Sequence, residues 1–348
     1  MKLVTYMTSG DWASGPWVGA MLDEDTVVDL RAAVALHSDA EALPSTLLDL
    51  IVDGDRSLDL ARSALERVAQ GDGRERTGVC FDRADVTLLP PLPRPSSIRQ
   101  FSLIEQHMLN AIDTMRKRGS VGGVKPALTG IPPAWYQIPA YFKSSVEEVY
   151  GPGDLIPWPQ YSGLLDFEFE IAAVIGRRGR AISAEDAETH IVGYTIFNDW
   201  SARDVQQLEM SVNLGPGICK DFASSMGPYL VTRDEFDMST SVATVSVDGE
   251  TWAETPIDMR LSFPDLLVAI SGEQTLMPGD VLTSGTVAGG CGIEHDRWIS
   301  AGSAVSLAAT GLGVLTNTVG LRGAGAPLPP SQRLAEAVST EYAPRIGY

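Results

Sequence analysis

Cysteine is scarce in this chain of 348 residues, and the three that occur, Cys80, Cys219 and Cys291, show no C-x-x-C spacing. An odd number at these separations argues against a disulfide framework and against a structural zinc site. A reducing cytoplasm is the compartment that fits this usage. The first twelve residues hold one lysine and no apolar core, so the sequence also predicts no secretory signal.

Long hydrophobic runs and positive charge are lacking as well. The longest uncharged stretch, 298–321, is interrupted by Gly, Ser, Thr and Asn, a pattern of strands and turns rather than of a membrane span. Lys and Arg total 26 against 45 Asp and Glu, which gives a net charge of −19. Such a field repels phosphate groups, so we expect neither a nucleic-acid nor a membrane partner.

The composition is that of a globular protein, with 44% hydrophobic and 20% charged residues. The length exceeds what one core usually organises, so we expect a small N-terminal α/β domain, 1–93, and a larger domain, 94–348. The boundary falls in the proline-rich segment 88–95, because these prolines cannot lie inside a helix or a central strand. In the small domain the pattern predicts strands at 3–7, 17–21 and 26–30, followed by helices around 47–51 and 58–68.

The larger domain is expected to be mainly β, which makes the whole chain α+β. A helix is predicted over 98–118, and the Gly- and Pro-rich segment 119–139 after it is long and apolar enough to be a lid. Strands are predicted at 167–175, 194–198, 229–232, 243–247, 281–284 and 304–307. Further helices are predicted near 184–190, 263–270 and 330–338.

The most informative segment is 165–176, where acidic and apolar residues alternate. Side chains two apart in a strand share a face, which places Asp166, Glu168 and Glu170 together. The segment continues into a run typical of burial on both faces, and crowded carboxylates there need a cation or a proton. Oxygen ligands of this kind suit Mg²⁺, Ca²⁺ or Mn²⁺. A solvated strand face is the alternative that the pattern leaves open.

A second acidic group follows a predicted strand that ends in Asn198-Asp199. Asp199 can cap the helix that begins there, or it can supply a third oxygen to a metal held by Glu168 and Glu170. The local pattern allows both roles.

Several segments in register resemble the fumarylacetoacetate hydrolase family. They are the acidic strand above, Gly193-Tyr194, Asn198-Asp199-Trp200-Ser201-Ala202-Arg203-Asp204 with Gln206, Lys220-Asp221-Phe222, Gly227-Pro228 and the run 278–286. The resemblance covers about 96–319 in one order. Several motifs in register are far more specific than any one of them alone.

This resemblance implies a mixed β-roll, sandwich-like catalytic domain, usually dimeric, with a divalent metal beside a His–Glu pair. Mg²⁺ is the metal expected first, with Ca²⁺ or Mn²⁺ as alternatives. By the resemblance, the metal ligands are Glu168, Glu170 and Asp199. The catalytic residues it implies are His107 as general base, Glu294 as the carboxylate that orients it, and Lys220 as the neutraliser of enolate charge. The substrate contacts it implies are Arg116, Gln206 and Thr286.

The chain departs from the family pattern at positions that cluster in this site. Gln100 stands where the family has a fourth aspartate ligand, and an amide carbonyl would ligate with one negative charge fewer. Ser102 and Phe142 stand at two substrate-contacting tyrosines, Ser224 stands at a threonine near the oxyanion, and Cys219 replaces a glycine. A lost phenol leaves its substrate partner unpaired, which argues against fumarylacetoacetate itself as the substrate.

Three hypotheses about function follow. The first is a metal-dependent hydrolase that cleaves a C–C bond in a β-dicarbonyl (1,3-diketo) or keto-enol acid, with water as nucleophile. The second keeps the metal and Lys220 without water, as in a decarboxylase, tautomerase or cyclase. The third is a metal-free, non-enzymatic member, which the joint presence of His107, Glu294 and Lys220 disfavours. We expect a cytoplasmic homodimer that acts on a small keto acid.

Overall fold

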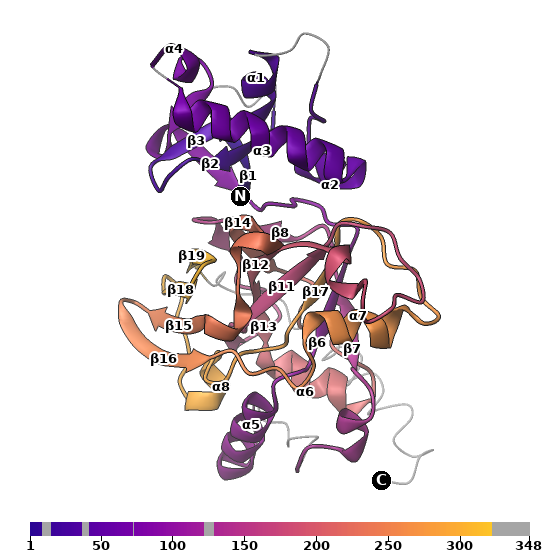
Figure 1. Ribbon diagram of the computed structural model, residues 1–348. Coiled ribbons are helices and arrows are strands. Elements are labelled where there is room, and N and C mark those ends of the chain that lie inside the picture. The colour runs from indigo at the N-terminus through magenta and orange to yellow at the C-terminus, as the bar shows by residue number, and fades with distance from the viewer. Residues whose placement is uncertain (9–14, 37–41, 72, 122–128, 322–348) are drawn as a thin grey trace, which may run out of the picture.

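The computed structural model describes residues 1–8, 15–36, 42–71, 73–121 and 129–321 (Figure 1). The protein is mixed α+β and dominated by sheet, as predicted. The helix predicted at 330–338 and the middle of the predicted lid, 122–128, lie outside the described residues. In the described ranges, every helix is too short or too polar to cross a bilayer.

The N-terminal part combines short antiparallel strands with four helices, which lie together at the top of Figure 1. Its strands are β1 (Lys2–Thr8), β2 (Trp17–Met21), β3 (Thr26–Asp29), β4 (Cys80–Asp82) and β5 (Val86–Leu89). Its helices are α1 (Leu30–Ala35), α2 (Leu47–Asp53), α3 (Asp55–Gln70) and α4 (Gly73–Arg76), with a 3₁₀ turn η1 (Arg83–Asp85). On α3 the buried residues Ala61, Ala64 and Val68 recur at helical spacing and form the face that packs inward.

The sheet of the N-terminal part continues into the rest of the molecule. β1 pairs antiparallel with β14 (Ser224–Thr232), with Leu3 opposite Leu230. The result is one twelve-stranded sheet, in which β5 pairs with β1, β8 pairs with β14, and the main order is β4-β3-β2-β1-β14-β12-β11-β17-β6-β7. Val28, Phe197 and Val281 contribute to one shared hydrophobic cluster. The division near residue 93 stays a prediction, and the sheet crosses it.

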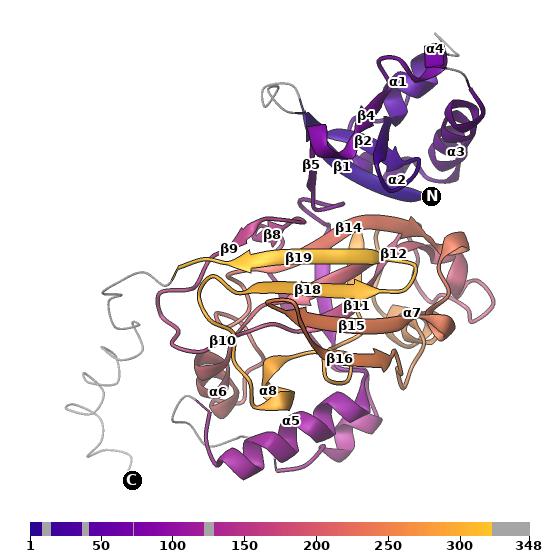
Figure 2. The same cartoon turned by 90° about the vertical axis from the view of Figure 1, so that its left-hand side faces the viewer.

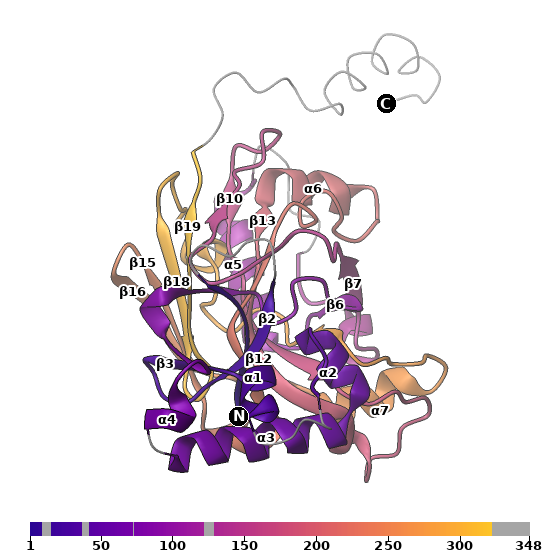
Figure 3. The ribbon, with the colours of Figure 1, turned by 90° about the horizontal axis from the view of Figure 1, so that it is seen from above.

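The larger part is built from two packed sheets. Its strands in the large sheet are β6 (Ser97–Phe101), β7 (Tyr141–Ser144), β8 (Val149–Tyr150), β11 (Phe169–Ile175), β12 (Ile191–Asp199), β14 and β17 (Asp280–Thr283). The second sheet runs β16 (Glu250–Pro256), β15 (Val242–Val247), β18 (Ala304–Ala309), β19 (Gly313–Val319), β9 (Leu155–Ile156). It faces the viewer in Figure 2 and lies on the opposite side of β12 from β6 and β7 in Figure 3. Ile196 of the large sheet and Val245 and Leu307 of the small one share the main core, as in a sandwich.

Short elements complete this part. A two-stranded pair is formed by β10 (Leu165–Asp166) and β13 (Ser201–Ala202). The helices are α5 (Glu105–Arg118), α6 (Arg203–Ser211), α7 (Phe263–Ser271) and α8 (Gly292–His295). The 3₁₀ turns are η2 (Pro133–Tyr136), η3 (Ala187–His190), η4 (Arg233–Glu235) and η5 (Met238–Thr240). α5, α6 and α8 gather at the end away from the N-terminal helices (Figures 1 and 2).

Two predicted helices differ from the structure. The helix predicted over 98–118 begins only at Glu105, because the residues before it form β6, which lies between β17 and β7 and is buried from Ile98 to Phe101. A central strand buried on both faces lacks alternation, so its apolar residues matched helical spacing by coincidence. The helix predicted near 184–190 is the single turn η3, because the chain must enter β12 at Ile191.

Candidate active site

Two neighbouring strands bring three carboxylates together. Glu168 precedes β11, Glu170 lies within it, and Asp199 ends the antiparallel partner β12. The Asn198 side chain accepts from the Glu168 backbone N–H at 3.0 Å, and the Asp199 N–H donates to the Glu168 carbonyl at 3.0 Å. Carboxylate oxygens of all three residues lie within 4.8 Å of one another, and all three side chains are buried. The solvated-face alternative therefore does not hold for Glu168 and Glu170.

Two buried cations lie against this cluster. Lys220 Nζ is 2.8 Å from Glu168 Oε2 and also bonds the Asp199 carboxylate and Ser201 Oγ. Arg203 Nη1 donates to Glu168 Oε1 at 2.6 Å. Burial lowers the pKa of Lys220, but the carboxylates of Asp199 and Glu168 raise it by more, so the ammonium stays charged. Glu168 is thereby held ionised between two cations.

Glu170 forms no ion pair with a lysine or arginine in the described part of the chain, and the atoms around it suit a metal. Burial, together with the charges of Asp199 and Glu168, raises the pKa of Glu170 well above its usual range, and burial raises that of Asp199 to about 7. Gln100 Nε2 donates to Asp199 Oδ1 at 3.0 Å and to the Ser144 hydroxyl. Gln100 Oε1 and Glu170 Oε2 are buried and have no hydrogen-bond partner among the described residues. Unpartnered oxygens beside crowded carboxylates fit a divalent cation with oxygen ligands.

Asp166 serves a different purpose from the two glutamates that follow it. The predicted strand is interrupted at residues 167–168, and Asp166 lies in β10. It accepts hydrogen bonds from Arg203 Nε at 2.8 Å and from the backbone N–H groups of Gly292 and Ile293 at 2.8 and 3.1 Å. Asp166 therefore anchors the first turn of α8 and orients Arg203 toward Glu168.

α8 and α5 together form a histidine–carboxylate pair. His107 Nδ1 on α5 lies 2.8 Å from Glu294 Oε1 on α8. Glu294 Oε2 accepts from Asn110 Nδ2 at 2.9 Å and from the Gly289 N–H at 2.8 Å. The sequence interpretation missed Asn110, although its position three residues after His107 on one helix face was a usable signal. The bonds from Asn110 and Gly289 fix the carboxylate that orients the imidazole.

The electrostatics of this pair suit proton transfer. Burial lowers the pKa of His107, but the Glu294 and Glu168 carboxylates raise it by more, so it ends above its usual value. Burial raises the pKa of Glu294, and His107, Gly289 and Asn110 lower it below its usual value. A carboxylate that stays ionised beside an imidazole is the arrangement of a positioned general base.

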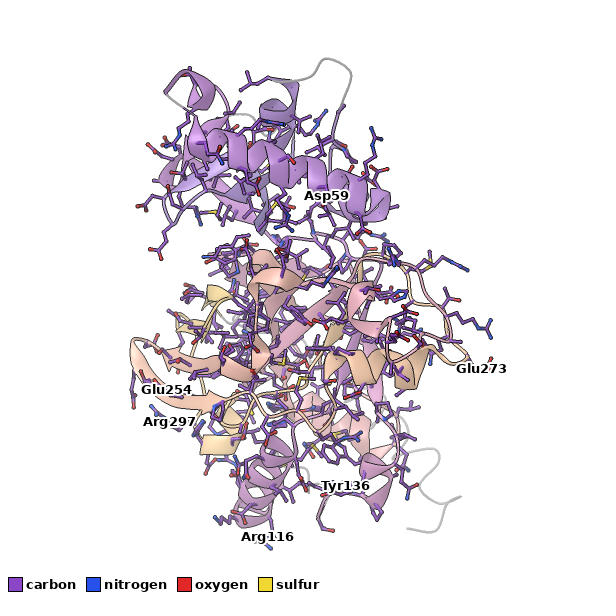
Figure 4. All side chains as sticks on the ribbon, viewed as in Figure 1. Asp59, Arg116, Tyr136, Glu254, Glu273 and Arg297 are labelled. Carbon is purple, nitrogen blue, oxygen red and sulfur yellow. The ribbon has the colours of Figure 1, made fainter. Side chains whose placement is uncertain are left out.

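One cavity of about 560 Å³ is lined by His107 of the pair and by Glu168 and Glu170 of the carboxylates. Of the residues expected in the site, those that line it are Gln100, Ser102, His107, Phe142, Glu168, Glu170, Gln206, Lys220 and Thr286. Within the described part of the chain, the expected site residues that do not line it are Asp199, Glu294, Ser224 and Arg116. Asp199 and Glu294 lie behind it, bonded to Lys220 and to His107. Ser224 is buried opposite Asp199 on β14. Arg116 pairs with Asp113 at 2.7 Å, and its side chain is 71% exposed at the outer end of α5 (Figure 4).

Comparison with known proteins agrees with this geometry. The family model described as "Fumarylacetoacetate (FAA) hydrolase C-terminal" matches residues 111–320. The oxaloacetate tautomerase YisK of Bacillus subtilis (strain 168) is 29% identical over 324 residues, which cover 92% of this chain and 100% of that protein. The mitochondrial oxaloacetate tautomerase fahd2 of Xenopus laevis is 28% identical over 323 residues, 92% of this chain and 90% of that protein.

Solved structures show the same fold. The fumarylacetoacetate hydrolase from Exiguobacterium antarcticum has a TM-score of 0.65 at 24% identity and covers 92% of this chain and 100% of its own. The maleylpyruvate hydrolase from Sphingobium sp. SYK-6 was solved in complex with manganese(II) ion and pyruvate. It has a TM-score of 0.65 at 20% identity, and the match covers 93% of this chain and 100% of that chain.

Proposed function

The chain belongs to the fumarylacetoacetate hydrolase family and is an enzyme of that family, and on this premise we propose that it is a metal-dependent keto–enol tautomerase of a small β-dicarbonyl 2-oxo acid. The observation that carries the proposal is the contact of His107 Nδ1 with Glu294, where His107 lines a cavity that Glu168, Glu170 and Lys220 also line. A general base, His107, and groups that can stabilise a developing negative charge therefore face the same cavity.

The proton is moved by His107. With its Nδ1 proton donated to Glu294, the imidazole has Nε2 as its free basic nitrogen, and Nε2 takes a proton from the carbon between the two carbonyls. Glu294 stabilises the imidazolium that forms, and the same nitrogen returns the proton to oxygen or carbon. Lys220 supplies positive charge where the enolate develops, and Gln206 and Thr286 offer polar contacts to the acid.

The residues that would hold the metal are Glu168, Glu170 and Asp199, with Gln100 Oε1 as a neutral fourth donor. Bound there, a dication would polarise the substrate carbonyls and stabilise the enolate charge. The manganese(II) ion in complex with the maleylpyruvate hydrolase supports a divalent metal. We propose Mg²⁺ or Mn²⁺ for this oxygen-rich donor set, with Ca²⁺ as the alternative.

The names of the relatives support tautomerisation ahead of C–C hydrolysis. Both YisK and fahd2 are named oxaloacetate tautomerases, and each alignment covers 92% of this chain. Hydrolysis is the second candidate, because a His107 oriented by Glu294 can equally take a proton from water. In that reaction water adds to the distal carbonyl, the C–C bond breaks, and a carboxylate and pyruvate are released.

One NMR experiment in D₂O separates the two reactions. The metal-loaded protein is incubated with a 2,4-dioxo acid that carries an alkyl tail. Tautomerisation predicts that the C3 hydrogens exchange faster with the protein than in buffer alone and that no new product forms. A metal chelator should abolish this acceleration. Appearance of pyruvate would support hydrolysis, and exchange at the buffer rate without pyruvate would contradict both reactions. The cytoplasmic location and the homodimer belong to the same proposal, and sedimentation of the metal-loaded protein tests the latter.

A further inference from the structure

The cavity around the catalytic pair divides into a polar end and an apolar wall. From this division we infer, resting on the proposed function, that the substrate is a 2-oxo acid with one carboxylate and an uncharged, apolar tail. A distal carboxylate, as in oxaloacetate, is the feature that the cavity disfavours.

The size of the cavity exceeds the needs of a four-carbon acid. Its volume of about 560 Å³ lies within the range of about 300–1,000 Å³ that is typical of sites for drug-sized ligands. The metal-ligating carboxylates and His107 account for one end only. The remaining space is available to a tail beyond the second carbonyl.

Little positive charge lines the cavity itself. Among the described residues that line the cavity, Lys220 is the one lysine or arginine, and its ammonium already bonds Glu168 and Asp199. Arg116 pairs with Asp113 and points to solvent. A second carboxylate against this wall would lose hydration without gaining an ion pair from the described lining residues, which is unfavourable.

The wall opposite is apolar and held in place. It comes from η2 and the residues just after it, from β7, and from the last turn of α6 with the segment that follows. Its principal members are Trp135, Ile138, Phe142, Met210 and Leu214. The Phe142 ring centroid lies 5.9 Å from Lys220 Nζ, which marks where the wall meets the polar end. Leu214 and Ile138 are 71% and 58% exposed, apolar area that a bound tail would cover.

Two polar groups of the wall, the Trp135 indole N–H and the Ile138 carbonyl, are already paired. Trp135 Nε1 donates to Ser102 Oγ at 3.1 Å, so the hydroxyl that stands in place of a phenol holds the wall. The Arg260 guanidinium lies 4.5 Å from the Trp135 ring centroid and donates to the Ile138 carbonyl at 2.8 Å. These contacts fix the indole and leave its ring as an apolar surface.

Two inert analogues with the same head group test this inference by binding alone. N-isobutyloxamate and N-carboxymethyloxamate differ only in an isopropyl group against a carboxylate of similar shape. In calorimetry on the full-length, Mn²⁺-loaded protein, we expect the isobutyl compound to bind at least tenfold more tightly. Lengthening an alkyl tail should tighten binding about three- to fourfold per buried methylene.

A charge introduced into the wall provides the complementary test. Met210→Arg should reverse the preference toward N-carboxymethyloxamate, whereas Met210→Leu should leave it unchanged; Leu214→Arg on the exposed loop serves if Met210→Arg does not fold. Equal or tighter binding of N-carboxymethyloxamate by the unaltered protein would overturn the inference and leave the proposed function standing. Failure of oxamate itself to bind would overturn the proposed function and the inference together.

Discussion

Replacing Asp166 by asparagine should destabilise the protein strongly while sparing its metal site. The Asp166 carboxylate is fully buried and accepts from Arg203 and from the backbone N–H groups of Phe167, Gly292 and Ile293. An amide of the same shape has one acceptor oxygen, so at least one of these donors loses its partner. Hydrogen bonds to a charged group contribute about 1.5–3 kcal/mol each, and breaking a buried ion pair costs about 3–5 kcal/mol.

These contributions overlap at one carboxylate, so we expect a loss of about 3–5 kcal/mol in the free energy of unfolding rather than their sum. Urea unfolding should show a lower midpoint with an unchanged slope. Asp113→Asn, which removes a partly exposed ion-pair carboxylate, is the control and should move the midpoint little. Calorimetry should find that Asp166→Asn retains most of the Mn²⁺ affinity that Asp199→Asn loses. An unchanged urea midpoint, or metal loss equal to that of Asp199→Asn, would refute this reasoning.

Two further predictions concern the metal and the base. Gln100→Asp should tighten Mn²⁺ binding, because it adds an anionic ligand to the site. It should also lower the thermal midpoint of the metal-free protein, because it adds a negative charge beside Asp199. Unchanged or weaker affinity in calorimetry would show that position 100 is not a ligand. Glu294→Gln should reduce the rate and shift the acidic limb of the pH–rate profile to lower pH. The reason is that the variant lacks the carboxylate that raises the pKa of His107, so the imidazole stays neutral at lower pH. A shift to higher pH would contradict the pairing of the two residues.

The sequence located the acidic residues of the site better than it located their partners. Alternation at 165–176 predicted three acids on one strand face, with a metal site and a solvated face both open, and two of the three converge with Asp199. The role of Asp166 could not be predicted, because Gly292 and Ile293, whose backbone N–H groups it binds, lie more than 120 residues away in the first turn of α8. A side chain that accepts hydrogen bonds from a distant backbone segment cannot be recognised from the local sequence pattern.

Central strands and exposed side chains were also difficult to predict from the sequence. β6 was mistaken for the start of a helix, because a strand buried on both faces has no period of two. Arg116 was assigned to the substrate through resemblance alone, and in the structure it pairs with Asp113 on its own helix. An i, i+3 pair of this kind was visible in the sequence and competes with a distant ligand.

The claim that His107 and Glu294 act as one proton-transferring unit is tested most directly by the C3 exchange rate of a double variant. In the metal-saturated protein, His107→Ala should slow exchange by about a hundredfold or more. The double variant His107→Ala with Glu294→Gln should be at most about threefold slower than His107→Ala alone, because the carboxylate acts through the imidazole. Exchange near the unaltered rate in the double variant, with loss of exchange in Lys220→Met, would contradict the account and assign the reaction to the metal and Lys220 alone.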